Sequence, residues 1–390
     1  MLNRLNFLLI LLIAYRKKYI SIFIISSLLV ALVGSVVFIT ASIKKDIYAT
    51  LDAQADFTLQ RYRGGKVLDT PQEWVDQFLG FNGVQKAQGR IYGMHFYEPN
   101  ETYFMIVGID FYDNEIVKNL KKVVDNIDID KFLARKNMII GSGVKSFFDE
   151  YHYFDYYIFR PPDRGKEKVY IYDEFDNSTN IVSNDLIIMD IDLARKILGV
   201  PEGYVTDIIL DVPNPDERET LYTKLRIAHF NMRIIEKKDI KNHYENLYNY
   251  KGGIFLVLYI IVLSTFLLIL YQRYSMIKSV DAKEIAILRL SGWQIVEIVT
   301  FKMIENFIVI VSAYIFGIFL AYFFVYGLDA PLLRDIFIGY DNLSNSIAFS
   351  PDISVKELVT IFFIFVIPFM LTIVIPIWKI SIEDVSDVLR

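Results

Sequence analysis

The sequence predicts a membrane protein with four transmembrane α-helices, one before and three after a large extracytoplasmic α+β domain. The chain of 390 residues is 54% hydrophobic and has a mean hydropathy of +0.34, which is too apolar for a soluble protein. Yet 22% of its residues are charged, which is too many for a chain that lies wholly in lipid. Its apolar runs approach or exceed the roughly 20 residues that cross a bilayer, and a long polar stretch separates the first run from the second.

The composition excludes several classes of function. There is no cysteine, so neither a disulfide framework nor a thiol-based metal or catalytic site can form. The net charge of −5 and pI near 5.6 argue against a nucleic-acid partner, which would favour a basic surface. The histidines do not have a metal-binding spacing; they are His95, His152, His229 and His243. The sequence offers no catalytic, metal or cofactor-binding site, and we expect no enzyme activity in this chain.

The N-terminal region predicts an amphipathic helix followed by the first span. In residues 1–18 leucines recur at spacings of three and four among basic residues, so we expect a helix on the cytoplasmic face, with a signal-peptide n-region as the alternative. Residues 19–43 contain no charge and are long enough to cross the bilayer. This run exceeds the roughly 7–15 apolar residues of a cleaved signal peptide, so we expect an uncleaved helix. Basic residues precede it and acidic residues do not, which places the N-terminus in the cytoplasm.

Residues 44–251 are predicted to form the extracytoplasmic α+β domain. Its two ends continue the helical spacing of the neighbouring spans, so we expect them to form a helical stalk. Thr70 is expected to cap a helix in which Pro71 is the first residue and Glu73 the third. Further helices are predicted at Asp192–Leu198 and Asp216–His229, and strands at Tyr103–Ile109, Val169–Tyr172, Asp185–Met189 and Thr206–Val212.

The C-terminal third predicts the remaining spans. They are residues 252–274, 299–327 and 358–378, with an extracytoplasmic loop at 328–357 and a cytoplasmic tail at 379–390. Four crossings return the chain to the side on which it began. The basic residues between the second and third spans then lie in the cytoplasm, as the positive-inside rule expects.

Two motifs in the extracytoplasmic domain have alternative interpretations. Gly141–Ser146 resembles part of a phosphate-binding loop, but Val144 stands where Walker A requires glycine, so we expect a strand-to-helix turn. No other Walker A sequence occurs, so ATP hydrolysis would need another protein. The aromatic run Tyr151–Phe159, with Arg160, favours a strand pair or a partner surface, and the alternative is a site for an apolar or lipidic ligand.

The cytoplasmic segment 275–298 carries the main candidate site. Asp281–Trp293 reads D-A-K-E-I-A-I-L-R-L-S-G-W, which predicts a helix of about three turns at the membrane surface, with one face free to bind a partner. Apolar residues recur at helical spacing on one side: Ile285, Leu288 and either Ile287 or Leu290. The polar side is predicted to consist of Lys283, Glu284 and Arg289. Gly292 is expected to end the helix, and Trp293 to lie at the membrane interface.

A second candidate lies at the start of the next span. Lys302 and Glu305 are three residues apart on one helix face near the cytoplasm. We expect a local or interhelical ion pair rather than proton transfer.

These residues and the order of the spans resemble the FtsX/MacB/LolC–LolE superfamily of ABC transporter permeases. The superfamily has a coupling segment similar to R-E-I-G-x-x-R-A-L-G-A, here Lys283–Trp293 with Ala286 in place of glycine. Glu305 and Gly317 match the glutamate and the glycine of its next helix. Its closing pattern resembles D-P-V-E-A-L-R, which is matched after Pro376 and Lys379 by Asp384, Asp387, Leu389 and Arg390, with Val385 in place of proline.

The resemblance implies a stand-alone permease without a fused ATP-binding domain. The implied partners are a cytoplasmic ABC ATP-binding subunit that carries the ATP and Mg, a second identical or paralogous permease, membrane lipid, and a periplasmic adaptor or lipoprotein. It also implies the bacterial inner membrane and MacB/LolCDE-type transmission of movement to the extracytoplasmic domain, for export of a lipoprotein, peptide or small molecule. The alternative is an FtsX-like membrane-anchored signalling or scaffold protein.

Overall fold

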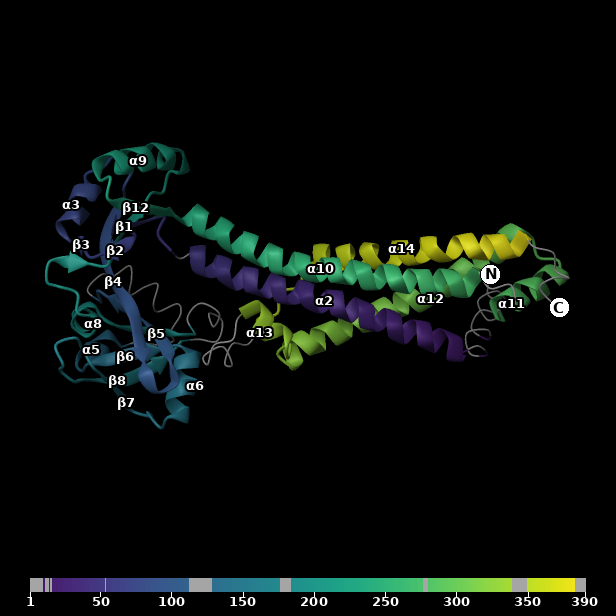
Figure 1. Ribbon diagram of the computed structural model, residues 1–390, viewed down its shortest axis with the longest axis horizontal. Helices are drawn as coiled ribbons and strands as arrows, with labels where there is room; N and C mark the ends of the chain where they lie inside the picture. The colour runs from purple at the N-terminus through teal and green to yellow at the C-terminus, as the bar shows by residue number, and fades with distance from the viewer. Residues whose placement is uncertain are drawn as a thin grey trace. The chain divides into compact units, whose positions relative to one another are not determined.

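The computed structural model describes residues 10, 14, 16–52, 54–111, 128–175, 184–275, 280–338 and 349–382 (Figure 1). The chain forms two compact units. We call residues 1–42, 249–334 and 351–390 the helical domain, and residues 43–248 and 335–350 the sheet domain.

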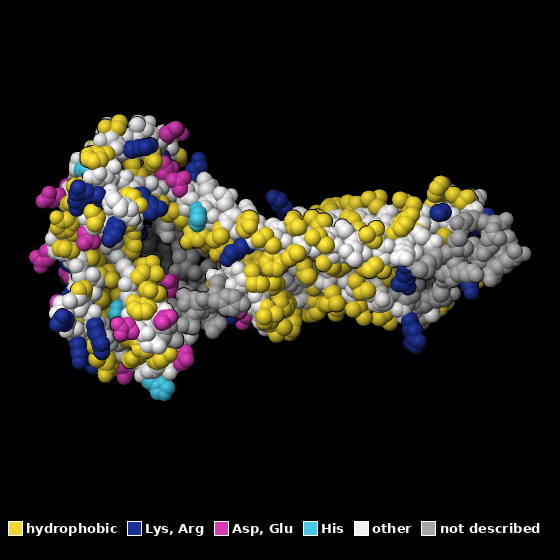
Figure 2. All heavy atoms as spheres, viewed as in Figure 1, with side chains coloured by type: hydrophobic (Ala, Val, Ile, Leu, Met, Phe, Trp, Pro, Cys, Tyr) yellow, Lys and Arg dark blue, Asp and Glu magenta, His cyan; other side chains and the backbone are white. Residues whose placement is uncertain are grey.

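The helical domain contains long apolar helices that confirm the predicted fold class. They are α2 (Arg16–Asp52), α10 (Lys237–Ser275), α12 (Ile295–Tyr322) with the π-helical turn η3 (Phe323–Gly327), and α14 (Val355–Ile382), joined by the shorter α11 (Val280–Leu290). Four are long and apolar enough to cross a membrane. Figure 2 shows hydrophobic side chains over much of their visible surface. The boundary between the domains falls within α2 and α10, which continue into the sheet domain.

Helices α2 and α12 approach each other closely at small residues. A Cβ atom added at Gly317 of α12 would lie 2.7 Å from the carbonyl oxygen of Ser27 and 2.7 Å from the Cβ of Val30. One added at Gly34 would lie 3.0 Å from the Cβ of Ala321. Small residues allow this backbone approach, on which packing between membrane helices depends.

Gly317→Leu is therefore expected to destabilise the protein by about 1–3 kcal/mol, because α2 has to move away to admit the side chain. The measurement is thermal unfolding of the full chain in detergent. Gly253→Leu is the matched control, since a Cβ added there meets nothing within 4 Å. Equal unfolding temperatures for the two variants would contradict the close approach of α2 and α12.

The sheet domain is built on a ten-stranded sheet in the order β12-β1-β11-β4-β5-β9-β6-β8-β7, with β2 paired to β1. Its strands pair antiparallel except for β5 with β9 and β6 with β8, which pair parallel. The strands are β1 (Phe57–Arg63), β2 (Lys66–Leu68), β4 (Lys86–Tyr97), β5 (Thr102–Ile109), β6 (Asn137–Ile140), β7 (Tyr156–Phe159), β8 (Glu167–Glu174), β9 (Leu186–Asp190), β11 (Asp207–Asp211) and β12 (Met232–Glu236). A two-stranded sheet joins β3 (Thr70–Pro71) to β10 (Tyr204–Val205).

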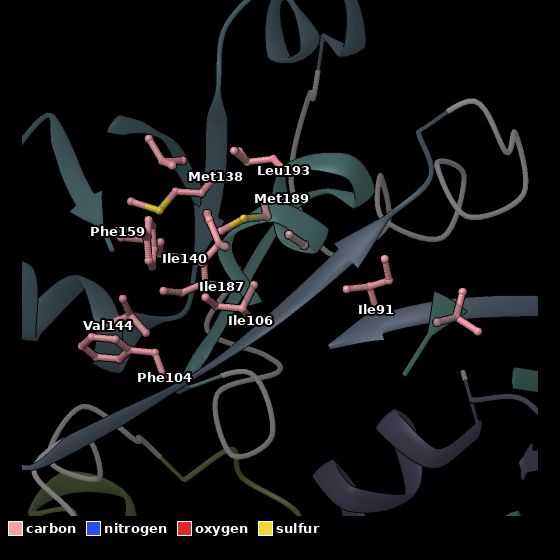
Figure 3. Packing of buried hydrophobic residues seen from close by; sticks show 14 of the residues in the cluster. Ile91, Phe104, Ile106, Met138, Ile140, Val144, Phe159, Ile187, Met189 and Leu193 are labelled. Atoms are coloured by element: carbon pink, nitrogen blue, oxygen red, sulfur yellow. The ribbon is translucent and has the colours of Figure 1, made fainter. Parts of the chain in front are cut away.

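Helices cover the sheet and close its core. They are α3 (Glu73–Leu79), the 3-10 turn η1 (Glu98–Asn100), α5 (Ile129–Leu133), α6 (Ser142–Glu150), α8 (Ile191–Leu198) and α9 (Pro215–Ala228); α13 (Leu333–Ile338) lies in the predicted loop 328–357. Strand β5 alternates between buried and more exposed residues, and Phe104 and Ile106 point into the core. Figure 3 shows Phe104 beside Val144 of α6 and Ile106 near Ile187 of β9, and Leu193 of α8 belongs to the same cluster.

The helix start predicted at Thr70 is wrong in detail. Thr70 and Pro71 form β3, and α3 begins only at Glu73. The Thr70 side chain is buried, and its hydroxyl accepts a hydrogen bond from the Arg61 backbone N–H at 3.2 Å. The Thr70 hydroxyl is therefore bonded to strand β1 and does not cap α3. The helix that follows Asn214 starts as its sequence predicts, because the Asn214 side chain accepts from the Asp216 N–H.

Glu167 supplies a pH-dependent contribution to the sheet domain. Its buried carboxylate forms ion pairs with Lys136 and Lys196, and the Lys136 Nζ lies 2.5 Å from the Glu167 Oε2. The hydrogen bonds from Lys136 and then Lys196 hold the pKa of Glu167 below its usual 4.5. A lowered pKa stabilises the fold above pH 4.5, and this stabilisation is lost as the pH falls through the pKa of the folded state.

We expect Glu167→Gln to lower the free energy of unfolding by about 1 kcal/mol at pH 7, the upper range for partly exposed ion pairs. Below pH 4.5 the difference from the wild-type chain should shrink. Unfolding temperatures measured between pH 3 and pH 8 check this, with Glu202→Gln as an exposed control. A difference that stays constant with pH would contradict an ionic contribution.

Candidate functional site at helix α11

Helix α11 ends where the sequence predicts. Gly292 has a φ of +90°, a left-handed conformation that favours glycine. Its N–H donates to the Arg289 carbonyl at 3.0 Å, and the Trp293 N–H donates to the Leu288 carbonyl at 3.2 Å. Trp293 is half-buried, and its ring meets Phe301 edge to face at 5.5 Å. The turn therefore fixes α11 against the start of α12.

The outer face of α11 differs from the sequence prediction. The inward side packs Ala282, Ile285, Ala286 and Leu288 into the core of the helical domain. Glu284, expected on the polar side, is also buried there, with 5% of its surface exposed.

The exposed residues are instead Lys283, Ile287 and Leu290, at spacings of four and three, and we call them the α11 outer face. Ile287 is 55% exposed and Leu290 67%, and Val296, 73% exposed, follows at the start of α12. Arg289 is half-buried beside this face. The α11 outer face is thus mainly apolar.

Glu284 is buried because a cation from α12 meets it. The Lys302 Nζ lies 2.6 Å from the Glu284 Oε2 and 2.8 Å from the Glu305 Oε2. Lys302 and Glu305 form the pair that their spacing predicts, but no local spacing reveals Glu284, the third member. Exposure of the lysine side chain is 1%, and of the glutamate side chains 6% and 0%. Buried charges are costly alone and are stabilised by pairing and hydrogen bonding.

Hydrogen bonds extend this group to two further helices. The Tyr19 hydroxyl of α2 donates to the Glu305 Oε1. The Tyr274 hydroxyl of α10 donates to the Asn306 Oδ1 at 2.6 Å, and the Asn306 Nδ2 donates to the Lys302 carbonyl at 2.8 Å. We call Tyr19, Glu284, Lys302 and Glu305 the ion cluster. It joins α2, α11 and α12, so α11 cannot shift without carrying Lys302 along or leaving a buried charge without its counterion.

Some predicted site residues lie outside the described residues. The backbone of Asp281 is in α11, but its side chain is not described. The tail residues Asp384, Asp387, Leu389 and Arg390 also lie outside the described ranges. Within those ranges no group of three or more His, Asp or Glu residues could hold a metal ion.

Gly141–Ser146 forms the strand-to-helix turn expected from its sequence, between β6 and α6. The N–H groups of Gly143 and Val144 both donate to the Asn184 carbonyl at 3.1 Å. The Ser142 hydroxyl donates to the Asn184 Oδ1 at 3.2 Å. Asn184 thus occupies the donors that a phosphate loop would present.

Comparison with protein families matches residues 254–385 to the FtsX-like permease C-terminal family. Among solved structures, the extracellular domain of the noncanonic ABC-type transporter YknZ from Gram-positive bacteria aligns at 10% identity with a TM-score of 0.32, covering 47% of this chain and 100% of that one. The periplasmic region of MacB from Actinobacillus actinomycetemcomitans aligns at 12% identity with a TM-score of 0.32, covering 49% and 93%. Comparison with curated proteins gave no match. The family match includes α11, Lys302 and Glu305.

Proposed function

We propose that this chain, an FtsX-like permease by its residues 254–385, is the membrane subunit of an ABC transporter, and that a separate ATP-binding subunit docks on α11. The observation that carries the proposal is the α11 outer face. Ile287 and Leu290 stay exposed on a helix whose opposite side is anchored by the ion cluster. An exposed apolar surface on an anchored helix suits a partner that must move the helix.

The ion cluster supports a mechanical role. Closure of two ATP-binding subunits would push α11, and the Lys302 ion pairs would carry the displacement to α12 and, through Tyr19, to α2. Helices α2 and α10 continue into the sheet domain as unbroken helices. There the Tyr48 hydroxyl of α2 donates to Glu245 of α10, and the Lys241 Nζ lies 4.6 Å from the centre of the Tyr48 ring. These contacts would make the two helices move as a pair.

In this account the protein acts on a substrate that is already outside the membrane. Residues 19–43 and 252–271 contain no charged side chain to line a polar path through the bilayer. The substrate class we propose is a lipoprotein, a peptide or a small molecule held by an extracytoplasmic adaptor. The chain would lie in the bacterial inner membrane with both termini in the cytoplasm, beside a second, identical or paralogous permease.

The proposal is tested by purifying the tagged full chain gently from its own cells. We expect a P-loop ATPase to accompany it and Mg-dependent ATP hydrolysis to elute with that partner. A salt wash that removes the partner should remove the hydrolysis as well. Recovery of the chain without any ATP-binding protein, after chemical crosslinking in the cells, would contradict the proposal.

A further inference from the structure

The strand β7 ends the large sheet and leaves one of its edges open. It pairs with β8, and the Ile171 N–H donates to the Asp155 carbonyl at 3.0 Å just before β7 begins. Hydrogen-bonded pairs alternate in an antiparallel ladder, so Tyr157 and Phe159 bond to β8, while the N–H and C=O groups of Tyr156 and Ile158 point away from it. Within the described ranges no backbone hydrogen bond reaches these outward groups. Figure 1 shows β7 at the margin of the sheet domain.

This edge lacks two of the features that usually prevent pairing, although β7 has only four residues and the Lys168 Nζ lies 3.7 Å from the centre of the Tyr156 ring. Proteins protect edge strands with proline, a bulge or a covering segment, and β7 has neither a proline nor a register shift against β8. The side chains of Tyr156 and Ile158 are 39% and 43% exposed, whereas Tyr157 and Phe159 pack into the core. One face of β7 is therefore buried in the core, and the side chains of its other face are partly exposed.

A groove of about 860 Å³ runs beside β7, within the size range of ligand-binding sites. Three of its lining residues come from β7, and the end of β4 and the segment before β7 contribute aromatic walls, among them His95, Tyr97 and Tyr153. The hydroxyls of Tyr97 and Tyr153 lie 3.5 Å apart. Added backbone hydrogen bonds and pockets for alternate side chains are what a protein offers when it binds an extended peptide at a sheet edge.

Charge differs between the two ends of β7. Asp155 precedes the strand and Arg160 follows it, both exposed. Glu167, the first residue of β8, is opposite Phe159. Lys166 precedes Glu167, so Lys166 lies at the Arg160 end of β7. Lys166 also lines the groove. A peptide with acidic residues at the Arg160 end and basic residues at the Asp155 end would complement these charges.

We propose that β7 binds an extended peptide segment of a partner protein as an additional strand, with its side chains in the aromatic groove. The segment alternates apolar and polar residues and carries an acidic end that faces Arg160 and Lys166. This inference concerns the sheet domain and does not depend on docking at α11.

The probes are fluorescent peptides with a core of alternating valine and threonine, two aspartates at one end and two lysines at the other, made in both directions. Binding to the full chain in detergent is followed by fluorescence anisotropy. We expect the peptide with aspartates at its N-terminus to bind more tightly, because antiparallel pairing places them beside Arg160, whereas the reverse peptide reaches Arg160 only in the less stable parallel pairing. The same peptide with N-methylated alternate residues should not bind. Failure of both directions to bind would overturn the proposal.

Ile158→Pro is the decisive variant, with Ile158→Ala as its matched control. Proline removes an N–H that points away from β8, so the ladder to β8 is kept, and edge strands accept proline. We expect Ile158→Pro to weaken peptide binding at least tenfold, and Ile158→Ala to change it less than threefold. Hydrogen exchange should show protection of the Tyr156 and Ile158 amides when the peptide binds. Equal binding by both variants would overturn strand addition.

Two other occupants are separated by the same variants. If a second copy of this chain covers β7, Ile158→Pro should lower the oligomeric state of the chain, and that result would overturn the peptide proposal. If the groove holds an apolar or lipidic small molecule, an apolar dye should displace the bound peptide and bind equally to Ile158→Pro, which would also overturn it. With the wild-type oligomeric state retained and no displacement, the peptide remains the occupant.

Discussion

Lys302→Ala is expected to destabilise the helical domain by about 3–5 kcal/mol, the usual cost of removing one partner from a buried ion pair. The variant takes away the cation that lies 2.6 Å from Glu284 and 2.8 Å from Glu305. Both carboxylates are buried, so the loss cannot be offset by water. The measurement is thermal unfolding of the full chain in detergent, followed at the same protein concentration for each variant.

The exposed Lys379 of α14 provides the matched control, and Lys379→Ala should unfold like the wild-type chain. A triple variant with Glu284→Gln, Lys302→Met and Glu305→Gln should regain most of the stability, since it removes the charges together. If Lys302→Ala unfolds at the wild-type temperature, the ion cluster does not anchor α11.

Ile287→Asp combined with Leu290→Asp should lower the affinity for the ATP-binding subunit at least 100-fold. Both side chains are more than half exposed, and central apolar anchors of an interface often contribute about 2 kcal/mol or more each. Placing carboxylates there would bury charge in the contact. The stability of the permease should hardly change, because these residues pack little against its own core.

The comparison is made by titrating purified ATP-binding subunit onto immobilised permease. Ile227→Asp in α9 is the matched control, because Ile227 is 79% exposed and lies in the sheet domain. An undiminished affinity of the double variant, beside a normally folded protein, would place the docking surface elsewhere than the α11 outer face.

The sequence predicted the long apolar helices of the helical domain because length and hydropathy are local properties. The end of α11 could also be predicted from the sequence, because the residue after a helix often adopts the left-handed conformation that favours glycine, as Gly292 does. The assignment of faces failed at Glu284. A charged side chain is expected to face outward, but Lys302, 18 positions later in another helix, makes burial of this carboxylate favourable.

The sheet domain shows the same limit. The strand at Tyr103–Ile109 could be recognised from its composition, but its neighbours β4 and β9 are set by contacts between distant segments. The local pattern predicts Thr70 as a helix cap, but its hydroxyl accepts from the Arg61 N–H of another strand. The open edge at Tyr156 and Ile158 depends on strand order, which no local pattern of the aromatic run reveals.

The most direct test of the central claim is site-specific photocrosslinking in living cells from α11. A photoreactive amino acid in place of Leu290, on the α11 outer face, should crosslink to an ATP-binding subunit. The same amino acid in place of Ile285, which is 1% exposed on the inward side, should not reach that subunit. Crosslinking of position 290 only to lipid, or only to proteins that bind no ATP, would show that α11 is not the docking helix.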